Sequence, residues 1–109
     1  MNLKTIFYSS RTNKNDIDIT DLNRIIKVNS DVVLLDVRSK QDFREGHLNN
    51  AINIPLYELE FCCNDKLEDK NKIIVVYCQS GIRSRKAVKI LSKNGFRNLY
   101  NLKNGLDGI

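Results

Sequence analysis

Two short and strongly apolar segments dominate the hydrophobic pattern of the chain. Val32–Val37, interrupted only by Asp36, and Ile73–Tyr77 consist almost entirely of Val, Ile and Leu. Such runs are typical of central parallel strands, which other elements cover on both faces. Weaker strand signals occur at Ala51–Ile54, at Asn98–Leu102, and where Ile17 and Ile19 alternate with Asp16 and Asp18.

Helical signals fill the gaps between these strands. Leu22, Ile25 and Ile26 have the i, i+3, i+4 spacing of a helix, with Thr20 as its predicted N-cap. Ser39 is expected to cap a short helix over 40–45 that ends at Gly46. Further along, Pro55 suits the first turn of a helix over 56–62, the polar segment 64–71 predicts turns, and an amphipathic helix over 83–94 ends at Gly95.

The order of these elements predicts an α/β fold. Strands that alternate with helices form a parallel sheet with helices on both faces. A length of 109 residues, with 41% hydrophobic and 28% charged residues, suits one globular domain and argues against disordered, collagen-like and coiled-coil chains. We assign the domain to residues 16–109. Residues 1–15 are polar and weakly patterned, and we interpret them as an N-terminal appendage or edge element.

Positive charge is concentrated in the last third of the chain. Residues 1–71 carry 10 basic and 12 acidic side chains, whereas residues 72–109 carry eight basic side chains and one acidic side chain, Asp107. This asymmetry points to an anionic partner: nucleic acid, acidic lipid or a small anion. The basic stretch 83–93 lacks interleaved aromatic residues that could stack on bases, so nucleic acid is not expected as a partner.

The sequence predicts neither a membrane span nor a metal site. Its longest uncharged apolar runs are only long enough for strands. The first residues lack a secretory core and a small-residue cleavage site, so a cytoplasmic location is expected. The three cysteines, Cys62, Cys63 and Cys78, form no C-x-x-C pair and are accompanied by a single histidine, so free thiols are expected.

The strongest candidate for chemistry follows the second apolar strand. Ligand sites in open parallel sheets lie beyond the carboxyl ends of the strands, and Cys78 occupies that position. A helix N-terminus and a nearby cation lower the pKa of a thiol, which makes it nucleophilic. Backbone N–H groups over residues 79–82 can form a nest for an anion, in which Gly81 supplies the unusual dihedrals. Arg83 can offer its planar guanidinium to an oxyanion.

Each of these residues also has a structural interpretation. Cys78 could be a small buried residue without reactivity, and Arg83 could be a solvated helix residue. The coincidence of position, glycine and arginine favours chemistry for both. The remaining basic residues of this helix are expected on its solvent-facing side; they are Arg85, Lys86, Lys89 and Lys93. Of these, Arg85 could also join Arg83 beside the nest.

Three motifs together resemble the rhodanese-like proteins, also called thiosulfate sulfurtransferases. They are Leu34–Arg38, Gly46–Leu48 followed by Ala51–Pro55, and Cys78–Ser84. The resemblance implies a three-layer sandwich with a central five-stranded parallel sheet, and it requires neither a metal nor an organic cofactor. It also implies that Cys78 is the nucleophile and carries a persulfide, cradled by the backbone amides of Gln79, Ser80, Gly81, Ile82 and Arg83. Many relatives have a second glycine and a tryptophan where this chain has Asn104–Ile109, which leaves the packing of that end open.

The same motifs contain Asp36, Arg38 and His47, which we interpret as structural residues near the site. Asp36 could act as a base, but pairing with Arg38 or capping of the local backbone is the favoured interpretation. His47 could titrate near neutral pH, but a local hydrogen bond that orients the following turn is favoured over a general base. Cys62 and Cys63 lie outside the motifs, and we interpret them as helix residues rather than as resolving thiols.

The predicted activity is a two-step transfer of sulfane sulfur. Cys78 takes sulfur from thiosulfate or a related persulfide donor, and a thiol, cyanide or a protein acceptor then removes it. One alternative is a sulfane carrier or docking module without turnover. Another is a cysteine phosphatase or arsenate reductase, whose loops usually have C-x5-R spacing, whereas Cys78 and Arg83 enclose only residues 79–82.

Overall fold

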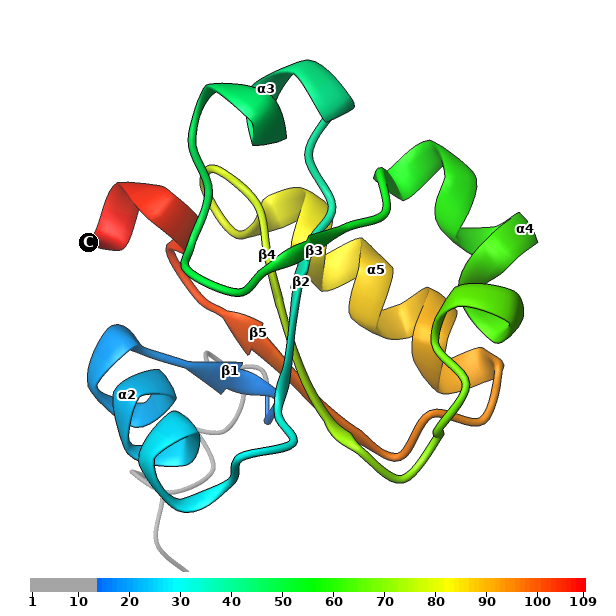
Figure 1. Ribbon diagram of the computed structural model, residues 1–109, viewed down its shortest axis with the longest axis horizontal. Coiled ribbons are helices and arrows are strands. Elements are labelled where there is room, and N and C mark those ends of the chain that lie inside the picture. The colour runs from blue at the N-terminus through cyan, green and yellow to red at the C-terminus, as the bar shows by residue number, and fades with distance from the viewer. Residues whose placement is uncertain (1–13) are drawn as a thin grey trace, which may run out of the picture.

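A five-stranded parallel sheet runs through the middle of the molecule, with strand order β1-β5-β4-β2-β3 (Figure 1). The computed structural model describes residues 14–109; the larger part of the predicted N-terminal appendage, residues 1–13, lies outside the described residues. The strands are β1 (Asp16–Ile17), β2 (Val33–Asp36), β3 (Ile52–Asn53), β4 (Ile73–Tyr77) and β5 (Asn98–Leu102).

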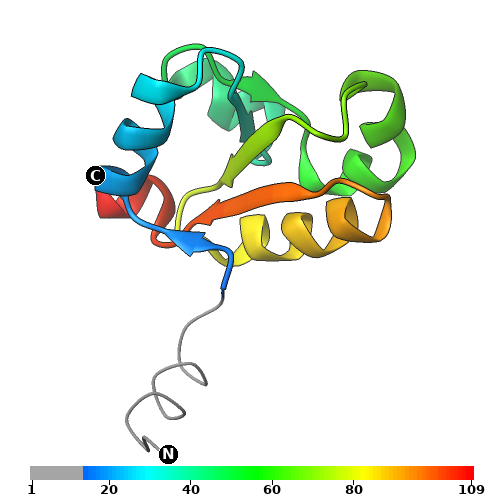
Figure 2. The same ribbon diagram turned by 90° about the horizontal axis from the view of Figure 1, so that it is seen from below.

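Helices cover both faces of this sheet, as Figure 2 shows for α2 and α5. The helices are α2 (Ile19–Val28), α3 (Lys40–Glu45), α4 (Leu56–Lys66) and α5 (Ile82–Lys93), followed by a short 3-10 turn, η1 (Gly105–Gly108). Helices α4 and α5 bury their apolar sides against one face of the sheet, and α2 lies on the other face. The predicted three-layer arrangement is therefore confirmed.

The central strand β4 explains why the apolar run at 73–77 is continuous. Side chains of a strand alternate between its two faces. Ile74 and Val76 pack with α4 and α5, whereas Val75 and Tyr77 pack with Leu22 of α2. Because both faces are buried, neither set of positions tolerates polar residues. Cys78 continues directly from this most buried strand, so its backbone is fixed by the core.

Two predicted helix boundaries are wrong, each for a local reason. Helix α2 begins at Ile19 and is capped by Asp18 rather than Thr20, so Ile19 is not part of a strand. The Asp18 carboxylate accepts a 2.8 Å hydrogen bond from the Asp21 backbone N–H, and the Asp21 carboxylate accepts a 3.1 Å hydrogen bond from the Asp18 backbone N–H. The two bonds form a capping box. Helix α4 continues to Lys66 instead of ending at residue 62, because Cys63 faces the core while the polar residues after it face solvent.

The other predicted boundaries agree closely with the structure. Ser39 caps α3, and the backbone of Gly46 ends it. Gly95, with φ of +91°, follows the C-cap of α5 as expected for a left-handed position. Among residues 14–109, no helix combines the length and the apolar character that a bilayer span requires.

Candidate functional site

The candidate site lies at the carboxyl edge of the sheet, in the loop between β4 and α5. Cys78 is the first residue after β4, and α5 begins four residues later at Ile82. Strands β2 and β5 flank β4 on its two sides, so the loop emerges from the middle of the sheet. This is where parallel α/β sheets place their ligands.

The sulfur of Cys78 is surrounded by hydrogen-bond donors. Its Sγ accepts a 3.1 Å hydrogen bond from the Gly81 N–H and a 3.4 Å one from the Ser84 N–H. The Ser84 hydroxyl lies 3.4 Å from the same sulfur. Cys78 is only 1% exposed and Ser84 is fully buried, so these contacts are shielded from water. Such donors stabilise a thiolate more than a thiol.

The ionisation of Cys78 reflects this balance of burial and hydrogen bonding. Burial by itself would raise the pKa of the Cys78 thiol. The Ser84 hydroxyl and the backbone N–H groups of Ser84, Gly81 and Ser80 outweigh it, so the pKa lies below its ordinary value of 9.0. The loop therefore favours the nucleophilic thiolate form of the sulfur.

Ser84 is a site residue that the sequence interpretation named only as part of a motif. It stands in the first turn of α5, one residue beyond Arg83, and its side chain turns inward to the sulfur. The signal was its position in the first helical turn, where side chains and backbone N–H groups both point toward the preceding loop. The sequence alone did not show that this hydroxyl faces Cys78.

Gly81 makes the sharp turn that brings the donors onto the sulfur. Its φ of +95° lies in the left-handed region, and it serves as the N-cap of α5. A Cβ atom at this position would overlap the backbone carbonyl of Lys103, which passes directly beneath the loop. Only glycine meets both requirements, because it lacks a Cβ atom and accepts positive φ without strain.

The remaining loop residues face outward. Gln79, Ser80 and Arg83 are exposed, and the side chain of Ile82 is 63% exposed. Arg83 forms no ion pair with any residue in the part of the chain that the structure describes. Its guanidinium is exposed to solvent and is not held by an ion pair within these residues.

Arg85 lies next to the loop, where its backbone N–H donates to the Gly81 carbonyl at 3.2 Å, but its guanidinium is ion-paired. Its guanidinium lies 3.3 Å from the carboxylate of Asp16 in β1. The buried side chain of Asn101 donates to the other Asp16 oxygen at 3.0 Å and to the Gly81 carbonyl at 3.3 Å. This network ties the loop to the edge of the sheet. The lysines of α5, Lys86, Lys89 and Lys93, are exposed to solvent as expected.

Asp36 and Arg38 form a buried ion pair at the end of β2. Arg38 Nε lies 3.1 Å from both oxygens of Asp36, and its terminal nitrogen lies 2.8 Å from Oδ2. Asp36 is 0% exposed and Arg38 is 6% exposed. The same guanidinium donates to the Gly46 carbonyl at 2.6 Å, which ties the end of α3 to the sheet. Both carboxylate oxygens are thus occupied by a permanently charged partner.

His47 makes local contacts only. Its Nδ1 lies 2.7 Å from the Phe43 carbonyl, one turn earlier, and its ring stacks on the Phe43 ring with centroids 3.7 Å apart. These two contacts hold the chain as it leaves α3. Within residues 14–109, His47 makes no hydrogen bond or ring contact with Cys78 or its loop.

Cys62 and Cys63 lie on α4, away from the loop in the chain. The thiol of Cys62 donates to the Glu58 carbonyl at 3.2 Å, one helical turn earlier. Cys63 is fully buried in the core, and this burial raises the pKa of its thiol. Within residues 14–109, no group of three His, Cys, Asp or Glu side chains is arranged to hold a metal ion.

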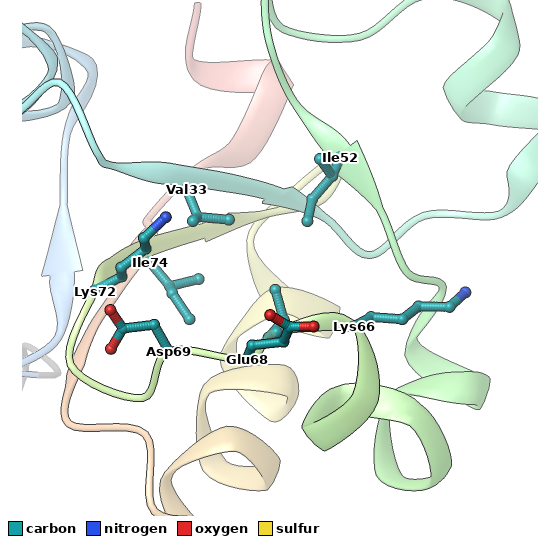
Figure 3. A pocket seen from close by; sticks show the side chains of 8 residues that line it. Val33, Ile52, Lys66, Glu68, Asp69, Lys72 and Ile74 are labelled. Atoms are coloured by element: carbon teal, nitrogen blue, oxygen red, sulfur yellow. The ribbon is translucent and has the colours of Figure 1, made fainter.

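A separate cavity of about 250 Å³ opens at the opposite end of the sheet (Figure 3). Val33 and Ile74 lie at or next to the start of β2 and β4, and both line it together with Ile52. Charged side chains, including Glu68, Asp69 and Lys72, surround this apolar floor in Figure 3. The lining residues include no thiol, so the cavity offers no sulfur that could carry a persulfide.

Comparisons with known proteins agree with the fold. Residues 18–109 match the family described as the rhodanese-like domain. A tRNA uridine(34) hydroxylase from Buchnera aphidicola is 34% identical over 109 residues, which cover 96% of this chain and 35% of that protein. The chain thus spans about a third of the length of that relative.

Solved structures show the same architecture. A rhodanese-related protein from Thermoplasma volcanium is 34% identical, with a TM-score of 0.72 over 84% of this chain and 86% of that one. A structure described as a rhodanese with anions, from E. coli, is 35% identical, with a TM-score of 0.65 over 72% of this chain and 91% of that one. The layers and the sheet described above are therefore those of a known fold.

Proposed function

The chain belongs to the rhodanese-like domain family, and we propose that it is a sulfurtransferase that carries sulfane sulfur on Cys78. The observation that carries this proposal is the hydrogen-bonded sulfur itself. Cys78 Sγ lies within 3.1–3.4 Å of the Gly81 N–H, the Ser84 N–H and the Ser84 hydroxyl, at the start of a helix. This environment supports a thiolate and the persulfide anion that would replace it.

In the first step the Cys78 thiolate attacks the outer sulfur of a small anionic donor such as thiosulfate. A sulfur–sulfur bond forms at Cys78, and the sulfur–sulfur bond of thiosulfate breaks. The bonding electron pair leaves with sulfite, and the transferred sulfur keeps its negative charge as the terminal atom of the persulfide. The inward N–H groups and the N-terminus of α5 stabilise that charge.

In the second step a thiophilic acceptor attacks the terminal sulfur and restores the Cys78 thiolate. Cyanide serves as an acceptor in an assay, and a small thiol or the cysteine of a protein partner is the expected acceptor in the cell. Neither step transfers a proton when the acceptor reacts as an anion, that is, as cyanide or as a thiolate. A general base is therefore not needed, and the ion-paired Asp36 and the stacked His47 have structural rather than chemical roles in this proposal.

The observations support three other functions less well. The loop encloses only residues 79–82 between Cys78 and Arg83, which suits a sulfur atom better than a tetrahedral phosphate or arsenate. A carrier without turnover shares the first step and lacks the second. Hydroxylation of a tRNA uridine is suggested by a relative's name, but that relative is about three times as long as this chain.

The test is to charge the protein and then discharge it. Purified protein is incubated with thiosulfate, its intact mass is recorded, and cyanide is added while thiocyanate is assayed. A gain of one sulfur atom that cyanide removes with catalytic turnover supports the sulfurtransferase. A gain that no thiol or cyanide removes indicates a carrier. Hydrolysis of an aryl phosphate without any gain of sulfur rules the proposal out.

We expect Arg83→Ala to weaken donor binding more than turnover. The free guanidinium of Arg83 is the cation of the loop's outer rim, and a charge-assisted hydrogen bond to a sulfonate oxygen is worth about tenfold in affinity. The KM for thiosulfate should rise about tenfold, with a smaller change in kcat. Lys86→Ala, an exposed cation on the same helix, is the matched control. An unchanged KM in Arg83→Ala refutes its role in donor binding.

We also expect Cys78 to ionise at lower pH than an ordinary thiol. Thiolate absorbance is recorded against pH as the difference between the wild type and Cys78→Ala, which removes the signals of Cys62 and Cys63. The midpoint should lie below 9.0, because hydrogen bonds to the sulfur lower the pKa of Cys78. Sulfur loading should rise with pH through this midpoint and then level off.

The same lowered pKa fixes the sign of a stability effect. Deprotonation of Cys78 stabilises the folded state at pH values above the folded pKa, and this contribution is complete above the unfolded value of 9.0. It disappears as the pH falls through the folded pKa. If the thiolate titration of Cys78 has its midpoint at or above pH 9.0, the role given to Ser84 and the loop amides is contradicted.

A further inference from the structure

The last turn of the fold, η1, is fastened to the candidate loop. Figures 1 and 2 both place this turn beside the segment between β4 and α5. The Leu106 N–H donates to the Cys78 carbonyl at 3.0 Å, and the Asp107 N–H donates to the Gln79 carbonyl at 2.9 Å. The Gln79 side-chain amide donates to the Asp107 carboxylate at 2.7 Å.

The approach between the two segments is very close. A Cβ atom on Gly105 would overlap the backbone carbonyl of Cys78 and contact that of Gln79 at 2.7 Å. Gly105 also has a φ of +55°, in the region where residues with side chains are rarely found. Glycine at this position is therefore what allows η1 to reach both carbonyls.

These contacts determine which way the loop amides point. In a trans peptide group the C=O and the following N–H point in opposite directions. When η1 holds the Gln79 carbonyl outward, the Ser80 N–H must point to the opposite side, toward the sulfur. That N–H is one of the groups that lower the pKa of Cys78. The Cys78 carbonyl, held by Leu106, fixes the Gln79 N–H in the same way.

We propose that η1 is a positioning clamp for the reacting sulfur, in which the Leu106 and Asp107 amides hold the Cys78 and Gln79 carbonyls outward and thereby aim the loop amides inward. This inference deepens the proposed sulfur transfer and rests on it. Leu106 and Asp107 touch no reacting atom; they act through the loop backbone.

The charged groups around the loop do not account for the lowered pKa of Cys78. The elements packed against it carry Asp107 in η1, Arg83 and Arg85 in α5, Asp16 in β1, Lys103 after β5, and the Asp36–Arg38 pair at the end of β2. Arg85 is paired with Asp16, and Arg38 with Asp36. The largest influences on the pKa of the Cys78 thiol are burial and hydrogen bonds.

The test compares Asp107→Pro with Asp107→Ala. Both variants lose the carboxylate, but only proline also loses the N–H that holds the Gln79 carbonyl. We expect Asp107→Pro to raise the pKa of Cys78 by about one relative to Asp107→Ala, since one hydrogen bond to the thiolate is weakened. Thiolate absorbance measures this without any sulfur donor. An equal Cys78 pKa in the two variants overturns the clamp.

A second measurement keeps the inference testable if Asp107→Pro does not fold. In the wild type, hydrogen exchange at the Leu106 and Asp107 amides should be slowed at least about tenfold relative to an unstructured peptide. Exchange at the unstructured rate overturns the clamp. Failure of the proposed function has a different signature: the Cys78 pKa shifts in Asp107→Pro, yet the wild type gains no sulfur from thiosulfate.

Discussion

Cys78→Ser is expected to abolish sulfur loading and to reduce thiocyanate formation by a factor on the order of 10³ or more. A serine hydroxyl remains protonated at neutral pH, and its oxygen cannot form the persulfide on which both proposed steps depend. The substitution is nearly isosteric in a site where the sulfur is 1% exposed, so the fold should be retained. Intact mass after incubation with thiosulfate measures loading, and the cyanide assay measures turnover.

Cys62→Ser provides the matched control for this prediction. Cys62 is partly buried in α4, and its thiol contacts the Glu58 carbonyl within its own helix. We expect this variant to gain and release sulfur like the wild type. A gain of sulfur in Cys78→Ser, or a loss of loading in Cys62→Ser, would move the nucleophile away from Cys78 and contradict the proposed function.

The largest expected effect on stability is that of Arg38→Ala. The substitution leaves the Asp36 carboxylate, which is 0% exposed, without its cationic partner. Breaking a buried ion pair by removing one partner costs about 3–5 kcal/mol. The Gly46 carbonyl also loses its 2.6 Å hydrogen bond, so α3 should loosen as well. Urea denaturation followed by circular dichroism measures the free energy of unfolding.

Arg24→Ala tests whether burial is the reason for this cost. Arg24 and Asp21 lie 3.8 Å apart in α2, with side chains that are 72% and 43% exposed. Solvent screens such a pair, and its loss should change the free energy of unfolding by less than about 1 kcal/mol. If Arg38→Ala costs no more than Arg24→Ala, the buried pair does not stabilise the fold.

The sheet could be predicted from sequence wherever both faces of a strand are buried. Strands β2 and β4 stand out as continuous apolar runs because residues such as Leu35 and Val75 contact helices on opposite sides. The predicted start of α2 was wrong because threonine and aspartate are both good N-caps. The type of residue alone therefore cannot choose between Asp18 and Thr20. The predicted end of α4 was wrong because the polar residues on the solvent side of its last turn, 64–66, resemble a turn in sequence.

The candidate loop could be predicted because its residues are contiguous from Cys78 to Arg83, although the contact of the Ser84 hydroxyl with the sulfur could not. What could not be predicted are the contacts made by residues far away in the sequence. Asn101 reaches the Gly81 carbonyl, and Asp107 reaches Gln79 across 28 positions. The partner of Arg85 is Asp16, 69 positions earlier, which no local charge pattern reveals. Such pairs follow from the strand order, not from spacing along the chain.

The place of β5 between β1 and β4 has a consequence for how the protein matures. Among residues 14–109, β1 pairs only with β5, so β1 must wait for residues 98–102 before it finds this partner. The backbone of Lys103 and the turn η1 follow β5 immediately. We therefore expect a chain that already exposes Cys78 but not residues 98–108 to lack the backbone contacts that fix the loop around the sulfur. The site of Cys78 is complete only once residues 98–108 have folded onto the sheet.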